Sequence, residues 1–393
     1  MRAEFEKPGG PLDPTNRERD AREMRRSGAV AVMAYIALLT SCGGTSTQPR
    51  PIPTSVTTSP TTAPFAVAPS ATTSPPTGPR VVAKGALAVA PPLTVGREAW
   101  VAVSVATLWH TPGSARAVDG PALTNPAGIR QWLSRMTLTD RRGLNGRADT
   151  QALLGDRVIV VARSGSWVKV VIPEQPTPLD ARGYPGWVPA GQLTAVRPFA
   201  STWVATVVVR TTYLRTDNVA ATPVTEISFG TRLPRVGVTG AWVRVATPTG
   251  RVLRLAAGAV AVRAPIAAAL PRTGSDVVRA AQMFNGLPYL WAGRSGFGFD
   301  CSGLTSLVLR AHGVIVPRDA DAQAVRGTKV STSALRPGDL LFYATRGHVH
   351  HVSIYAGSGR MVQSPNTGSS VQTIAMSTPS YARELSGARR YIG

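Results

Sequence analysis

Two hydrophobic spacings dominate the last third of the chain. Apolar residues at the i, i+3, i+4 and i+7 positions predict an amphipathic helix: Leu304, Leu307, Val308 and Ala311. This helix begins near Cys301 and ends at Gly313. Alternation from His351 to Gly357 predicts a strand, and a glycine turn then leads into a second strand over residues 360–363. A further helix is expected from Asp276 to Phe284.

The middle of the chain contains an internal repeat. The segment from Gly155 to Val170 matches the segment from Gly230 to Val245, with glycine, glycine and tryptophan at the same spacing. Short alternating strands with glycine turns predict small antiparallel barrels that resemble bacterial SH3-like domains, over residues 93–198 and 199–265. The first barrel is enlarged by residues 125–144, which include a helical piece around residues 129–133.

The N-terminal region has the pattern of an exported lipoprotein. Arg25 and Arg26 precede an apolar run from Gly28 to Thr40 that is too short to span a bilayer and ends just before Cys42. Residues 1–41 are therefore expected to be a precursor region, with translation starting at Met24. Cys42 is expected to be acylated, which anchors the protein to the outer face of the bacterial cell membrane.

Residues 42–92 are rich in Thr, Ser, Pro, Ala and Gly and have almost no charge. Such a segment cannot bury enough apolar surface to fold, so we expect a disordered tether. A domain over residues 272–393 completes the expected organisation.

The charge balance is strongly basic, with 43 Lys and Arg against 21 Asp and Glu and a formal net charge of +22. Arginine is spread along the whole chain without a recognition motif, so we expect no nucleic-acid partner. An exported protein of this charge is expected to attract anionic cell-wall polymers, and we expect a monomer.

Cys301 is the candidate nucleophile. It has no expected disulfide partner, because Cys42 is assigned to acylation. The first turn of a helix favours a thiolate, which predicts a thiol pKa below the free value of roughly 8.5. The unpaired N–H groups of that turn can also hold an oxyanion. His351 is the candidate base, and pairing across the hairpin lets Gln363 accept its second ring N–H.

Other interpretations stay open at this point. A lone cysteine is most often an inert buried residue. His348 and His350 share a strand face, but no cysteine or nearby carboxylate completes a zinc site, so no metal and no cofactor are expected. His110 and His312 look like ordinary surface or helix-end residues.

Taken together, the motifs resemble the NlpC-type cell-wall cysteine peptidases, a papain-like α+β family. The matching segments occur in the family's order: Leu287 to Gly293, Phe299 to Leu304, Leu335 to Phe342, and His351 to Gly357 with Gln363. The resemblance implies hydrolysis of the bond between D-glutamate and a diamino acid in murein peptides. Cys301 would be the nucleophile, His351 the base and Gln363 the third member, in place of the commoner histidine.

The resemblance also implies a substrate site. Tyr289 would assist the oxyanion, while Trp291, Asp300 and Ser302 would line the site; the alternative for these residues is core packing.

A barrel pair before such a domain is similar to γ-D-glutamyl-L-diamino acid endopeptidases, which act on murein peptides with a free N-terminal L-Ala. Asp149 and Tyr184 match their amine-binding positions. Asp149 is one methylene shorter than the usual glutamate, and a solvated turn carboxylate is its alternative interpretation.

Three functions therefore compete. The first is a peptidase for released peptidoglycan-derived peptides with a free L-Ala. The second is an autolysin-type endopeptidase on intact peptidoglycan stems, and the third is a non-catalytic wall-binding lipoprotein.

Overall fold

The computed structural model describes residues 91–393. The predicted signal region, the Cys42 acylation site and the tether lie outside the described residues, apart from the last two residues of the tether. Within residues 91–393, no helix combines the length and the apolar character needed to cross a membrane.

The first barrel is a seven-stranded antiparallel sheet with the order β3-β2-β6-β5-β4-β1-β7. Its strands are β1 (Glu98–Val101), β2 (Val105–Trp109), β3 (Ala148–Leu153), β4 (Arg157–Ser164), β5 (Trp167–Ile172), β6 (Tyr184–Pro189) and β7 (Leu193–Thr194). A short 3-10 turn, η2 (Ala190–Gln192), joins the last two strands. Valine, leucine and alanine side chains from alternate positions fill the interior of this barrel.

The second barrel repeats the same strand order, β10-β9-β13-β12-β11-β8-β14. Its strands are β8 (Val204–Val207), β9 (Thr211–Thr216), β10 (Pro223–Ser228), β11 (Arg232–Thr239), β12 (Trp242–Ala246), β13 (Val252–Ala256) and β14 (Val260–Arg263), with the 3-10 turn η3 (Ala257–Ala259) before the last. Gly155 and Gly230 have φ of +85° and +81°, a region that favours glycine. The turn glycines of the repeat therefore have the same backbone conformation in both barrels.

Short helices enlarge the first barrel between β2 and β3. They are η1 (Ala117–Asp119), α2 (Gly120–Leu123), α3 (Ile129–Arg135) and α4 (Leu138–Arg142), and α3 contains the predicted helical piece. Trp132 of α3 packs on Trp109 with ring centroids 6.1 Å apart, and its Nε1 donates to the buried Asp119 at 2.9 Å. These side chains belong to a hydrophobic core that the first barrel shares with the C-terminal domain.

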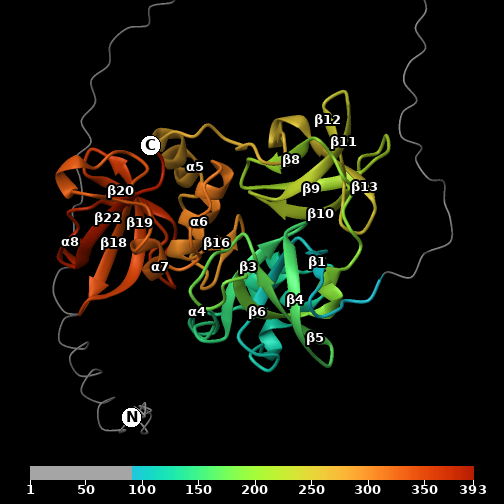
Figure 1. The fold of residues 1–393 in the computed structure, drawn as a ribbon, viewed down its shortest axis with the longest axis horizontal. Coiled ribbons are helices and arrows are strands. Elements are labelled where there is room, and N and C mark those ends of the chain that lie inside the picture. Colours follow the sequence, from blue (N-terminus) through green and yellow to red (C-terminus); the bar gives the residue numbers. More distant parts are fainter. Residues whose placement is uncertain (1–90) are drawn as a thin grey trace, which may run out of the picture. The chain divides into compact units, whose positions relative to one another are not determined.

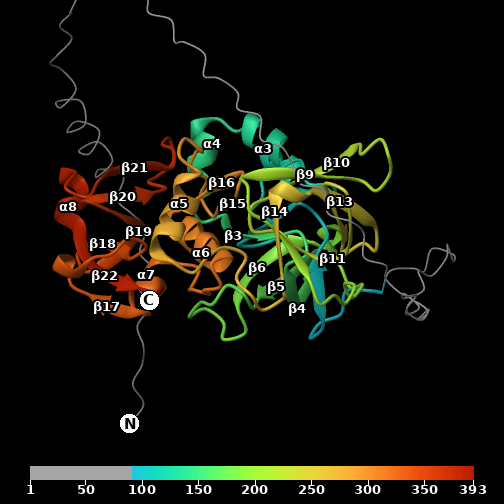
Figure 2. The same cartoon turned by 90° about the horizontal axis from the view of Figure 1, so that it is seen from above.

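The C-terminal domain combines helices with a six-stranded antiparallel sheet of order β17-β22-β18-β19-β20-β21. Its elements are α5 (Gly274–Gln282), β15 (Arg294–Ser295), β16 (Gly298–Phe299), α6 (Cys301–Ala311), α7 (Ala320–Ala324), β17 (Thr328–Val330), η4 (Thr332–Ala334), β18 (Leu340–Thr345), β19 (His348–Gly357), β20 (Arg360–Gln363), β21 (Gln372–Ala375), α8 (Pro379–Glu384) and β22 (Leu385–Arg390). The predicted Cys301 helix is confirmed, and the predicted helix over 276–284 is α5, shifted by two residues. Figures 1 and 2 both show α5 and α6 between this sheet and the two barrels.

Arg310, near the end of α6, joins the three domains. Its guanidinium contacts Asp156 at 2.7 Å and Glu174 at 2.5 Å, both in the first barrel, and donates to the carbonyl of Gly230 in the second. Phe229 of the second barrel also packs edge-on against Phe284, with centroids 5.3 Å apart. Helix α6 is thus fixed at its C-terminal end by both barrels, while Cys301 lies at its other end.

Candidate active site

Cys301 is the first residue of α6. Asp300 caps the helix, because its carboxylate accepts from the backbone N–H of Gly303 at 2.6 Å. The other backbone N–H groups of the first turn have no intrahelical acceptors and lie next to the Cys301 side chain. The residue is partly exposed and lines a pocket, so it is not enclosed in the core, although its sulfur is largely shielded from solvent.

His351 lies on β19, and Gln363 ends the neighbouring β20. The Nε2 atom of His351 and the Oε1 atom of Gln363 are 2.6 Å apart, which confirms the predicted contact. An amide oxygen only accepts, so the ring must carry its proton on Nε2. The Nδ1 lone pair therefore remains to take a proton from another group.

The predicted low pKa of Cys301 is wrong for this state of the protein. Burial, reinforced by the nearby charge of Asp300, raises the pKa of the thiol to about 12. Burial also lowers the pKa of His351 to about 4. Burial outweighs the favourable effect of the helix N-terminus, and it favours the neutral thiol and the neutral imidazole in this pair.

Two tyrosine rings enclose the imidazole. The ring centroid of His351 is 5.4 Å from that of Tyr343 and 5.7 Å from that of Tyr381. The Tyr343 hydroxyl forms hydrogen bonds with Ser353 and Met361, and not with the histidine. This packing helps to explain why His351 as a whole is only 5% exposed.

A buried arginine connects the nucleophile helix to the first barrel. Arg318 makes a two-point contact with the Asp300 carboxylate, at 2.6 and 3.1 Å, and its Nε donates to Thr150 of β3 at 2.7 Å. It also donates to the Ser302 hydroxyl at 3.0 Å. Asp300 and Ser302 are therefore held by Arg318, at the bottom of the pocket.

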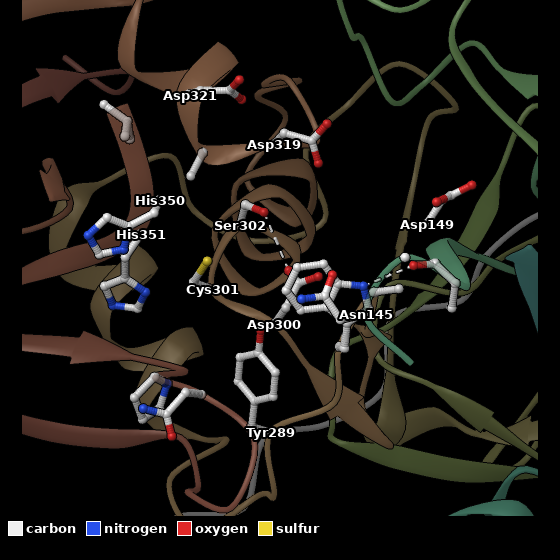
Figure 3. Close-up of a pocket in the computed structure, with 18 of the residues that line it drawn as sticks. Asn145, Asp149, Tyr289, Asp300, Cys301, Ser302, Asp319, Asp321, His350 and His351 are labelled. Carbon is white, nitrogen blue, oxygen red and sulfur yellow. Dashed lines mark hydrogen bonds between the residues drawn. The ribbon is translucent and has the colours of Figure 1, made fainter. Parts of the chain in front are cut away.

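The pocket has a volume of about 670 Å³ and extends from His351 to the first barrel. Figure 3 shows His351 and Asp149 on opposite sides of Cys301. Among the predicted substrate-site residues, six line the pocket: Tyr289, Trp291, Asp300, Ser302, Asp149 and Tyr184. Trp291 is 36% exposed, which excludes the core-packing alternative for this residue, and its Nε1 donates to the carbonyl of Ala148.

The end of the pocket in the first barrel is acidic. Asp149, on β3, is 3.4 Å from the Nδ1 of His110, and Tyr184, on β6, donates to Asp319 at 3.4 Å. Burial raises the pKa of Asp149, and it raises the pKa of Asp319 to about 6. Asp149 is thus a pocket residue and not only a solvated turn carboxylate.

Several pocket residues were missed in the sequence. Asp319 and Asp321 follow the apolar run of residues 314–317, and charged residues soon after an apolar run were the available signal. His110 was interpreted as an ordinary surface residue, yet it lines the pocket and pairs with Asp149. Tyr381 and Glu384, both on α8, gave no sequence signal that separates them from other helix residues.

The histidines of residues 91–393 are not clustered with other metal-binding side chains. Across residues 91–393, no group of three or more His, Cys, Asp or Glu side chains is arranged to hold a metal ion. Glu384 is 3.5 Å from His350 on the pocket rim, and this pair is too few for a tetrahedral site.

Comparison with known families agrees with this geometry. Residues 286–390 match the model of the NlpC/P60 family, and residues 207–262 match that of the YKFC SH3b2 domain. A relative from Bacillus cereus, gamma-D-glutamyl-L-lysine dipeptidyl-peptidase, is 41% identical over 305 residues, which cover 75% of this chain and 91% of the relative. The chain belongs to the NlpC/P60 family.

Two further similarities support the assignment. A Bacillus subtilis protein with the same name is 37% identical over 73% of this chain and 96% of its own length. The crystal structure of an NlpC/P60 family protein from Bacillus cereus superposes with a TM-score of 0.72 at 38% identity, covering 76% of this chain and all of that chain. The protein is therefore a cysteine peptidase with an α+β catalytic domain and SH3-like barrels.

Proposed function

We propose that the protein hydrolyses the bond between D-glutamate and a diamino acid in peptidoglycan-derived peptides that begin with a free L-Ala. The observation that carries the proposal is one pocket with two different ends. Cys301 and His351 lie at one end, and the carboxylates of Asp149 and Asp319 lie at the other, on the side of the first barrel. Buried carboxylates favour a positively charged group, such as the amine of L-Ala.

The chemistry follows from the tautomer of His351. As the sulfur attacks the γ-carbonyl carbon of D-glutamate, the thiol proton moves to Nδ1 of His351. The first-turn N–H groups of α6, with the Tyr289 hydroxyl, stabilise the oxyanion. The C–N bond then breaks, His351 gives its proton to the leaving amine, and water hydrolyses the thioester with His351 as base.

The neutral resting pair fits this sequence of steps. Because burial disfavours both charged forms, the thiol gives up its proton only when a carbonyl is in place to receive the sulfur electrons. Gln363 stabilises the imidazolium that forms, through the bond to Nε2.

Defined peptides test the proposal. We expect the wild-type protein to cleave L-Ala-γ-D-Glu-L-Lys and its diaminopimelate analogue, and Cys301→Ser to abolish this cleavage. Release of the diamino acid measures the turnover. The N-acetylated peptides should be turned over much more slowly. Equal turnover of free and blocked peptides would instead indicate an endopeptidase for intact stems, and no turnover of any peptide would leave a wall-binding function.

We also propose that Cys42 anchors the protein to the outer face of the cell membrane. The proposal is supported by the basic and apolar segments that precede Cys42. Cys42→Ser should release the protein from the membrane fraction and prevent incorporation of labelled fatty acid. Retention of Cys42→Ser in washed membranes would contradict lipid anchoring.

A further inference from the structure

Only one of the two polar atoms of the Gln363 side-chain amide has a hydrogen-bond partner within residues 91–393. Its side chain is fully buried, its Oε1 accepts from His351, and its Nε2 has no hydrogen-bond partner within residues 91–393. Buried amide N–H groups are nearly always paired, so this nitrogen indicates an interaction that the resting contacts do not complete.

The orientation of this amide decides whether His351 can act as a base. With Oε1 toward the ring, the proton stays on Nε2 and Nδ1 has its lone pair. With the amide turned over, Nε2 of Gln363 would face the ring, and the ring proton would have to move to Nδ1. Nδ1 could then no longer accept the thiol proton of Cys301. A histidine or a carboxylate at position 363 has no such dependence on an amide flip.

Tyr381 of α8 is the residue placed to hold the amide. Its ring packs against both His351 and Tyr343, with centroids 5.7 and 5.4 Å away, and it lines the catalytic pocket. The Tyr381 ring packs on the same imidazole that the Oε1 atom of Gln363 contacts, so the phenol and the unpaired Gln363 amide nitrogen both border His351. Burial raises the pKa of Tyr381, and the Gln363 amide acts in the opposite direction, as expected for an amide N–H near the phenol oxygen.

We propose that Tyr381 is a positioning residue whose phenol oxygen accepts from Nε2 of Gln363 and thereby keeps Oε1 directed at His351. A phenol oxygen can accept from the amide while its own hydrogen points elsewhere. This inference rests on the proposed peptidase function, because it concerns the base of that reaction.

The test combines Tyr381→Phe with two residues at position 363. In the natural Gln363 protein, Tyr381→Phe should lower kcat about ten-fold with KM nearly unchanged, because the Gln363 amide is then flipped in a large fraction of the molecules. In the Gln363→Glu protein the same substitution should lower kcat less than about three-fold, since either carboxylate oxygen accepts from His351. Equal losses in both proteins would overturn the proposal and assign Tyr381 to packing or substrate contact.

A second measurement needs no turnover. In protein with ¹⁵N-labelled histidine, the ring shifts of His351 should show the Nε2–H tautomer, and Tyr381→Phe should introduce the Nδ1–H tautomer. Tyr343→Phe is the matched control, because it removes a hydroxyl from the other ring on His351 but not one directed at Gln363. An unchanged tautomer in Tyr381→Phe would also overturn the proposal.

The two proposals fail in different ways. If wild-type protein turns over no peptide, the proposed function fails, whatever the tautomer. If wild-type protein is active and Tyr381→Phe equals it in both tautomer and kcat, only the role of Tyr381 fails.

Discussion

The two ends of the pocket differ in how the chain builds them. The reactive end comes from adjacent elements of one domain, α6, β19 and β20, and is closed by packing around His351. The acidic end combines Asp149 and Tyr184 of the first barrel with Asp319 of the C-terminal domain. We infer that the reactive end determines the chemistry and the acidic end determines which peptides reach it.

The two barrels also differ in their contribution to the pocket. Their strand orders are identical, yet none of the pocket-lining residues described comes from residues 199–265. Asp149 is the second residue of β3, whereas the second residue of β10 is Val224, which is 37% exposed. The two barrels therefore share one topology, but only the first presents side chains from its strands to the pocket.

Loss of the sulfur should have the largest effect and should separate the two ends. Cys301→Ser should lower kcat/KM by roughly 10⁴-fold or more, as removal of a nucleophile does in related catalytic triads. The acidic end is intact in this variant, so calorimetry should still detect binding of the free-amine peptide. Loss of binding together with activity would show that the ends are not independent.

Removal of the arginine between the ends should cost stability. Arg318→Met leaves the Asp300 carboxylate buried without its partner, which should lower the free energy of unfolding by about 3–5 kcal/mol. Chemical denaturation measures this loss. The double variant Asp300→Asn with Arg318→Met is the control, because it removes both charges and should recover part of the stability.

Neutralisation of the acidic end should impair recognition of one class of peptide. Asp319→Asn or Asp149→Asn should lower kcat/KM for the free-amine peptide by about 10- to 100-fold, the range for a lost charged hydrogen bond. The N-acetylated peptide should be unaffected. Asp217→Asn, at an exposed ion pair of the second barrel, is the matched control and should change neither value.

The pH dependence of activity on the free-amine peptide should follow the ionisation of the acidic end of the pocket and not that of Cys301 and His351. The pKa of Asp319 is about 6, so amine binding should weaken as pH falls through 6 and should level off at the 10- to 100-fold loss expected for Asp319→Asn. His351, with a pKa of about 4, stays neutral through this range. Above pH 8 the substrate amine loses its charge, which should complete a bell-shaped profile. If activity of the Asp319→Asn protein still fell with pH below 6, the titrating group would be another residue.

Changes on the surface of the second barrel should have the smallest effect. Tyr213→Ala removes an exposed ring that packs against Arg215 and does not line the pocket. Its kcat/KM on soluble peptides should stay within about two-fold of wild type, as for most surface substitutions. A larger loss would show that the second barrel also acts on catalysis.

The reactive end was largely predictable from the sequence because its signals are local. The helix stripe after Cys301 and the hairpin of His351 and Gln363 each lie within a few residues of one another. The acidic end depends on contacts between residues far apart in the chain. Only the resemblance to known peptidases pointed to Asp149 and Tyr184, and Asp319 was missed. The thiol pKa was predicted wrongly because burial depends on the packed structure and not on helix position alone.

The protonated resting sulfur has a consequence beyond peptide cleavage. Peroxides, disulfides and alkylating agents attack thiolates far faster than thiols. A nucleophile that ionises only during attack on its substrate is thereby protected against irreversible oxidation while it waits. Such protection matters here because residues 91–393 contain no second cysteine that could form a reversible disulfide with Cys301.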